Sequence, residues 1–466
     1  MPNEEVLDIL EGSVVAGGEA YVNQQGSDII TRSDADRTVS SWSELDSALG
    51  RSGVDVIWMD DDIDMTGNEF RLSGQILAGD RGQDGSDGPL LYTNSKGQNS
   101  VGGYGGSHRG SIELRGDCHL TGIRFRGATH DAFDHPEYSG YIPSPAYGSR
   151  TERDEIYTRD RSRGITVSTS NGEISNCEIY GFATQAISVG SHNNPRDTHI
   201  HHCHIHDNMQ NSMGYGVDVR RGNALVEFCY FNGHRHALNG GGRWNCSYTL
   251  RYSLLGPANS SHVVDMHRLG NNISSASSDF NDRDYIGNAG GNLVIENNTF
   301  LNTTLPDFSD SEVTRRANVG GEFTVFSPGD ICRDIAIRGV PWPRDGAGCS
   351  IKDNRTLHHG PPGFDNQEPY RSPKPDIPFI QQVRSGGLNV PNSRRNSRNF
   401  SDNFEISGNV YDSENEGDFD ASKGAPVDIH GGTSVGSLSP SRLPRQRGFP
   451  RARGEEIVRT LNSTDQ

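Results

Sequence analysis

The stretch Ile174-Ser-Asn-Cys177-Glu-Ile179 returns 26 residues later as Ile200-His-His-Cys203-His-Ile205, and after another 26 as Val226-Glu-Phe-Cys229-Tyr-Phe231. A repeat of this length indicates stacked copies of one supersecondary unit. Related segments extend the series in both directions: Leu120-Thr-Gly-Ile-Arg-Phe125, Tyr248-Thr-Leu-Arg-Tyr-Ser253, Ile295-Glu-Asn-Asn-Thr-Phe300 and Ile406-Ser-Gly-Asn-Val-Tyr411. The chain is therefore predicted to coil.

Further short runs with strand character lie between these copies, at Gly164–Ser168, Ala186–Val189, Tyr215–Val219 and His262–Met266. They are rich in β-branched residues and bounded by turn-forming residues, and no window in the region has apolar residues at helical spacing. Two or three strands per repeat predict an all-β fold, a right-handed parallel β-helix with long loop insertions and a short N-terminal helix. In such a coil, equivalent side chains stack about 4.8 Å apart.

The repeated cysteines are expected to form one such column, made of Cys177, Cys203 and Cys229. Packing is the favoured role, because free Cys behaves as a small buried hydrophobe, with metal binding or a disulfide as the alternatives. The chain has seven cysteines and no C-x-x-C spacing, so no disulfide framework is indicated.

The composition is acidic, with a net charge of −18, and only four of the 43 basic residues are lysine. Such a surface resembles proteins of salt-loving archaea, in which acidic side chains hold water and salt screens their repulsion. An ordinary acidic extracellular protein is the alternative. Nucleic acid and membrane insertion are not expected. With 32% hydrophobic residues and 57 glycines, only a thin core is expected.

The domain organisation is predicted from shifts in composition. A helix is expected at Ser41–Leu49, capped by Ser41 or Ser43. The predicted divisions are an acidic segment at 1–40 that serves for attachment, a β-helix at 41–303 with a loop insertion at 128–163, a long insertion or lateral subdomain at 304–400, a last coil at 401–415, and a tail at 416–466 with a basic run.

The start of the predicted coil carries a family resemblance. Strands are expected at Val54–Trp58 and Phe70–Leu77, and the second continues as Ala78-Gly-Asp-Arg-Gly82 before Leu120-Thr-Gly-Ile-Arg-Phe125. This opening resembles right-handed β-helix proteins of the pectate-lyase-like superfamily, in particular haloarchaeal members. The likeness covers residues 40 to 300, or to 415 at its widest. It implies a glycan target, and the calcium carboxylates of pectate lyases have no assignable match here.

Polar residues that can carry chemistry concentrate between Tyr215 and His267. On a strand, residues two apart point the same way, so His234 is expected to pair with His236, and Asp265 with His267. The pairs are about one rung apart and are predicted to converge. The four residues are candidate ligands of a divalent metal ion, which would be the cofactor, although the same groups can act as acid, base and charge neutraliser.

β-Helix polysaccharide lyases and epimerases resemble this arrangement, and they remove the C5 proton of a uronate while cations neutralise its carboxylate. On local chemistry alone, the candidates for neutralising that carboxylate are Arg235, Arg220 or Arg243, and the candidates for proton exchange are His236, His267 or Tyr215. The predicted catalytic residues are His236, His267, Asp265, Arg235, Tyr215, Asp218 and Arg220.

Two observations limit that assignment. Tyr215-Gly-Val-Asp218 resembles the Tyr-Gly-x-Asp motif of alginate epimerases, but Val219-Arg220 replaces the Pro-His that should follow, so no catalytic residue is carried over. A hydrolase that uses Asp218 and Asp265 as its two carboxylates is the other enzymatic alternative.

A second histidine cluster, His199-Ile-His201-His202-Cys203-His204-Ile-His206, alternates with apolar residues. With Ile200, Cys203 and Ile205 facing inward, His204 and His206 are expected to form an exposed stripe. It is interpreted as a solvated or sugar-facing surface, with adventitious binding of divalent metal as the alternative.

Two classes of function follow. The first is a lyase-like depolymerase of acidic cell-surface polysaccharide. It predicts a cleft with converged His, Arg and Asp side chains. The second is a glycan-binding spike or tail fibre of a haloarchaeal virus without catalysis, for which a homotrimer or attachment to the virion is expected. The N-terminal region has no secretory signal pattern, so an extracellular or virion-surface location without a signal peptide is expected, and a cytoplasmic one if neither holds.

Overall fold

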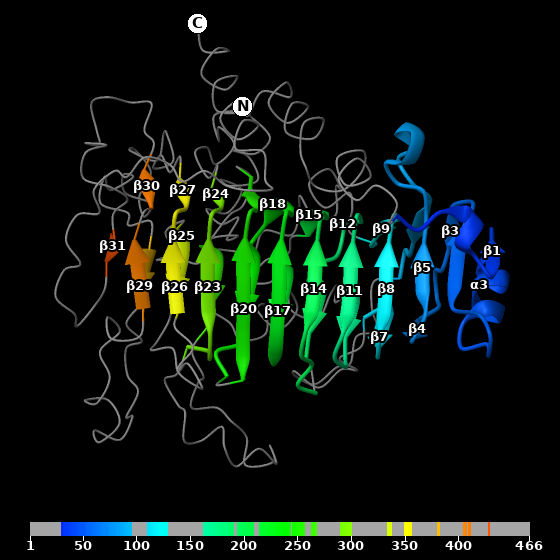
Figure 1. Ribbon diagram of the computed structural model, residues 1–466, viewed down its shortest axis with the longest axis horizontal. Coiled ribbons are helices and arrows are strands. Elements are labelled where there is room, and N and C mark those ends of the chain that lie inside the picture. Colours follow the sequence, from blue (N-terminus) through cyan, green and yellow to red (C-terminus); the bar gives the residue numbers. More distant parts are fainter. Residues whose placement is uncertain are drawn as a thin grey trace, which may run out of the picture.

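The computed structural model describes residues 29–95, 110–128, 162–190, 193–208, 214–243, 245–256, 262–267, 289–300, 333–337, 349–356, 380–382, 404–407, 409–411 and 427–428. Within these residues the chain forms three parallel sheets that wind into a right-handed β-helix (Figure 1). The predicted fold class is confirmed.

The three sheets are named A, B and C in the order in which the chain visits them. Sheet A contains β1 (Arg37–Val39), β2 (Val56–Met59), β5 (Ile76–Ala78), β8 (Cys118–Thr121), β11 (Gly172–Ser175), β14 (Thr198–His201), β17 (Gly222–Glu227), β20 (Cys246–Arg251), β23 (Leu293–Glu296), β26 (Cys349–Lys352) and β29 (Phe404–Ser407).

Sheet B contains β3 (Ile63–Asp64), β6 (Leu90–Tyr92), β9 (Arg124–Arg126), β12 (Glu178–Tyr180), β15 (His204–Asn208), β18 (Tyr230–His234), β21 (Leu254–Leu255), β24 (Thr299–Phe300), β27 (Arg355–Thr356) and β30 (Val410–Tyr411). Sheet C contains β4 (Phe70–Ser73), β7 (Ile112–Arg115), β10 (Arg163–Val167), β13 (Gln185–Val189), β16 (Tyr215–Val219), β19 (His236–Gly240), β22 (His262–Met266), β25 (Arg333–Ile337), β28 (Ile380–Gln382) and β31 (Val427–Asp428).

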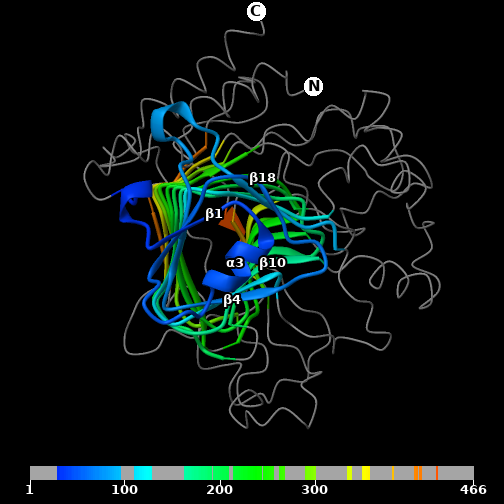
Figure 2. The ribbon, with the colours of Figure 1, turned by 90° about the vertical axis from the view of Figure 1, so that its right-hand side faces the viewer.

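Each strand pairs with its equivalent in the next rung, so like residues stack along the coil. Ile174 pairs with Ile200, which pairs with Val226, as the 26-residue repeat requires. Seen along its axis in Figure 2, the coil has the strands of each sheet behind one another. The apolar side chains that point between the sheets form one continuous core. In such parallel stacking, the strand amides and carbonyls of an inner rung find their hydrogen-bond partners in the rung above or the rung below.

From β8 onward, a two-residue turn joins each strand of sheet A to the next strand of sheet B, and it contains the repeated cysteines. Cys177, Cys203 and Cys229 are buried and unbridged, and the nearest acceptor of each thiol is the carbonyl oxygen two residues earlier, at 3.1–3.4 Å. Their expected stacking is confirmed. Along the same column the coil continues with buried asparagines, of which Asn298 donates to Asn354 and Asn354 to Asn409, both at 2.9 Å.

The first end of the coil is covered by a short helix, α3 (Trp42–Ala48). The Ser41 hydroxyl accepts a hydrogen bond from the Glu44 amide, as a helix N-cap does, which confirms the predicted helix. Leu45 and Ala48 enter the core, and Figure 2 shows the helix across the end of the coil. Two 3-10 turns, η2 (Arg32–Asp34) and η3 (Gln83–Gly85), complete the helical elements of the described residues.

The coil extends beyond the predicted boundary at residue 303. Strands β25 to β28 lie within the predicted insertion at 304–400 and continue all three sheets, and β31 lies within the predicted tail. The 26-residue spacing is lost there because long connections separate the strands, so periodicity does not reveal them. Residues 1–28, residues 129–161 of the predicted loop insertion at 128–163, and the basic run lie outside the described residues. No described helix is long and apolar enough to cross a membrane.

Candidate catalytic cluster on sheet C

The candidate site is built on one register position of sheet C. Ser188, Asp218, Asn239 and Asp265 pair in succession across β13, β16, β19 and β22. Each is flanked by residues of the core on its own strand; Asp218, for example, lies between Val217 and Val219. Because neighbouring residues of a strand face opposite ways, the column lies on the face of sheet C that is turned away from the core.

Asp218 is a carboxylate of this face with three side-chain donors. It is 2% exposed and accepts hydrogen bonds from Asn239 Nδ2 at 2.6 Å, from Arg220 Nε at 2.7 Å and from Gln185 Nε2. Because a carboxylate only accepts, these contacts fix the orientation of both amide groups. The pairing with Asp218 raises the pKa of Arg220 against the opposing effect of burial. Asp218 therefore holds its neighbours in place.

Three oxygen atoms beside Asp218 make no hydrogen bond within the described structure. They are Gln185 Oε1, Ser188 Oγ and Asn239 Oδ1, on side chains that are at most 5% exposed. A buried polar atom without a partner costs about 1–3 kcal/mol. Each such atom in a native structure requires an explanation, for example a catalytic role or an ordered water or ion. Sequence reasoning missed these three residues.

A signal for the missed residues exists in the sequence. Gly164-Ile-Thr-Val167, Ala186-Ile-Ser-Val189, Gly216-Val-Asp-Val219 and Ala237-Leu-Asn-Gly240 share a polar residue at their third position. An alignment of these strands predicts one polar column, to which Ser188 and Asn239 belong.

The second half of the cluster gathers around Asp265, which is fully buried. Its Oδ2 lies 3.1 Å from His267 Nε2 and 3.5 Å from His236 Nε2. Arg235 Nη1 lies 2.8 Å from the same His236 nitrogen and 3.5 Å from the Tyr215 hydroxyl. The rings of Tyr215 and His236 stack with centroids 5.4 Å apart. The predicted Asp265–His267 pair thus forms, and Arg235 joins it to Tyr215.

These contacts define the protonation of the cluster. A guanidinium only donates, so His236 Nε2 accepts from Arg235 and the imidazole is neutral. His267 Nε2 lies 3.1 Å from Asp265 Oδ2, an ion-pair distance without hydrogen-bond geometry. Burial is the main cause of the raised pKa of Tyr215. The charge of Arg235 lowers this pKa and that of Asp218 raises it, and the phenol stays protonated.

His234 lies apart from the cluster, although it was expected to pair with His236. Its Nε2 lies 2.8 Å from the carbonyl oxygen of Ile205, and its ring packs edge-on against Phe231. The reason is that Arg235 occupies the corner between β18 and β19, so the two histidines belong to different sheets. Burial lowers the pKa of His234 to about 4. Strand alternation does not apply across a corner.

Three of the four predicted metal ligands lie close together. One ligand atom from each of His236, Asp265 and His267 lies within 4.8 Å of the others. However, the His236 nitrogen that faces Asp265 already accepts from Arg235, whose positive charge opposes a metal cation at the same place. These residues do not fit a divalent metal ion well, and His234 is not among them.

The hydrolase alternative is also disfavoured by the geometry. Asp218 and Asp265 are two rungs apart in register, a backbone separation of about 9.6 Å. That value is close to the wide carboxylate spacing of inverting glycosidases. Asp218 nevertheless accepts from three donors, so it is poorly suited to exchange a proton.

The second histidine cluster is less exposed than predicted. His204 is 8% exposed and the His206 side chain 14%. The rings stack on each other at 4.2 Å, and on Tyr230 and Tyr180 of neighbouring rungs at 4.7 and 4.8 Å. The expectation of an exposed stripe is wrong, because these stacked rings cover the outer face of sheet B.

His206 also differs from its neighbour in charge. Burial alone would lower its pKa, but hydrogen bonds to Asp207 and Glu178 outweigh burial and raise the pKa to about 10. Burial lowers the pKa of His204. His206 is therefore an imidazolium held between two carboxylates, while His204 is neutral.

Comparisons of the chain with protein-family models, with curated proteins and with solved structures find no match. The pairing of the strands alone therefore carries the β-helix assignment.

Proposed function

We propose that the outer face of sheet C is the active site of a lyase that cleaves uronate-containing polysaccharide by β-elimination. One observation carries this proposal: His267 and Asp265 form a pair next to Arg235, His236 and Tyr215, so that base, cation and acid lie together. The His267 side chain is 34% exposed, whereas Asp265 is fully buried. A substrate therefore meets the histidine first.

The reaction assigns one role to each group. His267 removes the proton at C5 of the uronate, and the electron pair left behind is stabilised in the carboxylate by the Arg235 and Arg220 guanidinium groups. The C4–O bond then breaks as a C4=C5 double bond forms. The leaving oxygen takes a proton from the Tyr215 phenol, which burial keeps protonated. Asp265 positions His267.

The sugar contacts follow from the neighbouring oxygen atoms. Gln185 Oε1, Ser188 Oγ and Asn239 Oδ1 can accept hydrogen bonds from the hydroxyl groups of an adjacent sugar unit. Acidic polysaccharide of a haloarchaeal cell surface is the proposed target, and an extracellular or virion-surface location follows from that target. A spike without catalysis does not require a base, a cation and an acid in contact.

The test incubates the full chain in high salt with purified acidic polysaccharide while the ultraviolet absorbance of the unsaturated product is recorded. The wild type is expected to produce a rise. His267→Ala is expected to reduce kcat/KM about 10²- to 10⁴-fold, the usual contribution of a general base. Tyr215→Phe, which removes one oxygen, is expected to lower kcat more than it changes KM.

The matched control is His119→Gln, a histidine on the outer face of sheet A whose side chain is 17% exposed. Its activity is expected to equal that of the wild type. Shortening of the polymer without absorbance would contradict elimination and indicate a hydrolase. Retained binding with neither absorbance nor shortening would contradict catalysis and favour the spike.

A further inference from the structure

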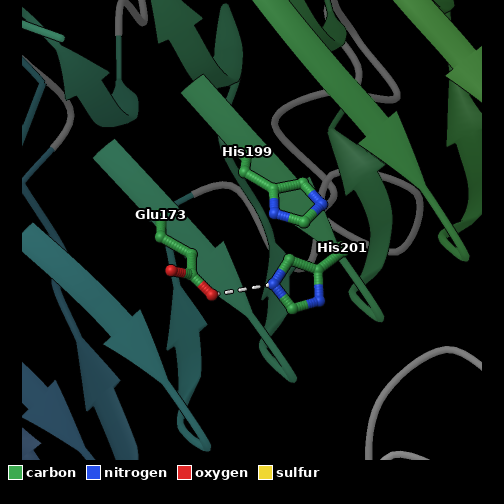
Figure 3. Close-up of side chains that lie close together, drawn as sticks. All are labelled: Glu173, His199 and His201. Carbon is green, nitrogen blue, oxygen red and sulfur yellow. Dashed lines mark hydrogen bonds and ion pairs between the residues drawn. The ribbon is translucent and has the colours of Figure 1, made fainter. Parts of the chain in front are cut away.

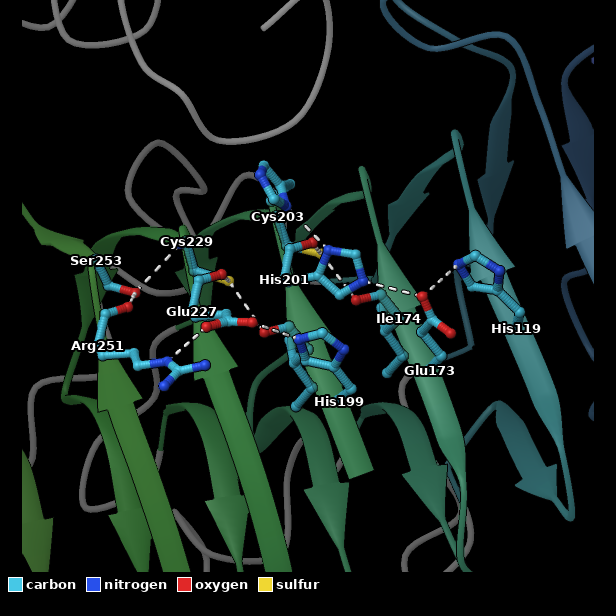
Figure 4. A network of polar contacts seen from close by, with 12 residues as sticks. His119, Glu173, Ile174, His199, His201, Cys203, Glu227, Cys229, Arg251 and Ser253 are labelled. Carbon is cyan, nitrogen blue, oxygen red and sulfur yellow. Dashed lines mark hydrogen bonds and ion pairs between the residues drawn. The ribbon is translucent and has the colours of Figure 1, made fainter. Parts of the chain in front are cut away.

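A ladder of alternating charge crosses the outer face of sheet A, away from the cluster on sheet C. Glu173 lies in register between His119 and His199, and Glu227 lies between His201 and Arg251. The ladder thus runs base, acid, base, acid, base over β8, β11, β14, β17 and β20. Figure 4 shows these side chains in a row.

Three members of the ladder converge. One ring nitrogen each of His199 and His201, and one carboxylate oxygen of Glu173, all lie within 4.8 Å of one another (Figure 3). The histidines are two residues apart on β14, and their rings stack with centroids 4.1 Å apart. His201 Nε2 already lies 3.0 Å from Glu173 Oε1. In a tetrahedral zinc site with bonds of 2.0–2.1 Å, ligand atoms are about 3.4 Å apart, so only a small movement is needed.

The neighbouring residues orient both rings. His199 Nε2 lies 2.9 Å from Glu227 Oε1, so the other nitrogen, Nδ1, is turned towards Glu173, as Figures 3 and 4 show. Arg251 holds Glu227 from its far side, with Nε 2.6 Å from Oε2. A carboxylate behind a metal-binding histidine is the usual second partner of such sites, because it fixes the tautomer and raises ligand basicity.

His201 is oriented in a similar way. Its Nε2 donates to Glu173 Oε1 at 3.0 Å, and its Nδ1 lies 2.9 Å from Nδ1 of His202. A metal ion at Nε2 takes the place of that proton, and Nδ1 then donates to His202. His202 stacks on Phe228 of the next turn, with ring centroids 4.9 Å apart. Both histidines therefore present one nitrogen to the same point, beside Glu173.

A second triad of similar layout gives the contrast. Glu178, His204 and His206 have the same spacing on sheet B, and their ligand atoms are also within 4.8 Å of one another. There, however, His206 has both nitrogens against carboxylates, with Nδ1 2.8 Å from Asp207 and Nε2 3.0 Å from Glu178. These two carboxylates raise the pKa of His206 to about 10, so His206 is an imidazolium and a metal ion competes poorly with its protons. The two triads differ in which atoms are available, not in sequence spacing.

We propose that Glu173, His199 and His201 bind a divalent transition-metal ion, with Zn²⁺ as the representative case. Two imidazoles and one carboxylate suit Zn²⁺, Co²⁺, Ni²⁺ and Cu²⁺, and they leave at least one coordination position open. The Glu173 and His199 side chains are 41% and 34% exposed, so water or an external ligand reaches that position. The ion ties β11 to β14.

The test uses the full chain, freed of metal with a chelator and titrated with Zn²⁺ by calorimetry and with Co²⁺ by visible absorption. The wild type is expected to bind one equivalent with the absorption of a His-ligated Co²⁺ ion. Glu173→Gln and His199→Gln are each expected to weaken binding at least tenfold. Zn²⁺ is expected to raise the thermal unfolding temperature of the wild type and not that of the two variants.

Two control variants locate the ion. Glu178→Gln alters the triad on sheet B and Asp265→Asn the cluster on sheet C, and both are expected to bind as the wild type does. Glu173 lies at the surface, so its variant is expected to fold, which circular dichroism checks. No saturable binding by the wild type, or loss of binding in either control with retention in Glu173→Gln, would overturn the proposal.

Discussion

The asparagine column at the turns between sheets A and B permits a quantitative prediction. Asn354 is fully buried, and its side chain makes four hydrogen bonds. Oδ1 accepts from the backbone amide and from Nδ2 of Asn298, at 3.0 and 2.9 Å. Nδ2 donates to the Ile295 carbonyl at 2.8 Å and to Asn409 Oδ1 at 2.9 Å. The perturbation is Asn354→Ala, which removes all four.

The expected cost follows from the number of bonds. Each buried hydrogen bond contributes about 1 kcal/mol net, so the loss is about 4 kcal/mol. Asn298→Ala removes three side-chain bonds, to Leu250, Ser253 and Asn354, and is expected to cost about 3 kcal/mol. Because the two side chains bond to each other, the double variant is expected to cost less than the sum.

The assay is native-state hydrogen exchange by mass spectrometry, supported by urea unfolding. A solenoid loses stability locally. The most direct measurement is therefore hydrogen exchange at the Asn298 backbone amide, because the variant removes its acceptor, Asn354 Oδ1. A loss of about 4 kcal/mol corresponds to exchange roughly 10³-fold faster.

The control is Asn68→Ala, which removes a half-buried side chain with one hydrogen bond of 3.3 Å, and is expected to change stability by less than about 0.5 kcal/mol. If Asn354→Ala costs no more than this control, the column does not hold the rungs together and the reasoning is refuted.

Two further predictions concern charge and backbone geometry. The pKa of His206 is raised from 6.5 to about 10, so the stability it contributes is fully present below pH 6.5 and is lost as the pH rises through 10. The urea midpoint of the wild type should fall between pH 6.5 and 10, and that of His206→Gln should stay constant. An equal change of midpoint with pH in both proteins would refute the ion pairs of His206. Gly122 has φ +69°, and a Cβ there would overlap the carbonyl oxygen of Gly79. Gly122→Ala should therefore lower the urea midpoint well beyond Gly53→Ala, which has φ +77° and open space around it; similar losses would show that backbone conformation alone matters.

The candidate site was predictable in part. The expected convergence of His236 with Asp265 and His267 across one rung is confirmed, because one ligand atom of each lies within 4.8 Å of the others. Asp265 lies on β22 and His267 directly follows that strand, so alternation placed them together correctly. The same rule failed for His234 and His236, because a corner at Arg235 separates them. The roles of Asn239 and Gln185 depend on register between strands and escaped a residue-by-residue interpretation.

The sequence by itself determined the fold. The 26-residue spacing of Cys177, Cys203 and Cys229 reflects equal rungs, because the segments that join sheets C, A and B there are similar in length. Only the tertiary structure decided which polar groups meet. On sheet C, Tyr215 and His236 pair across 21 residues, whereas Asn239 and Asp265 pair across 26. Loops of unequal length separate these strands. The alignment of one rung on the next is therefore set by backbone pairing and core packing, which no spacing in the chain encodes.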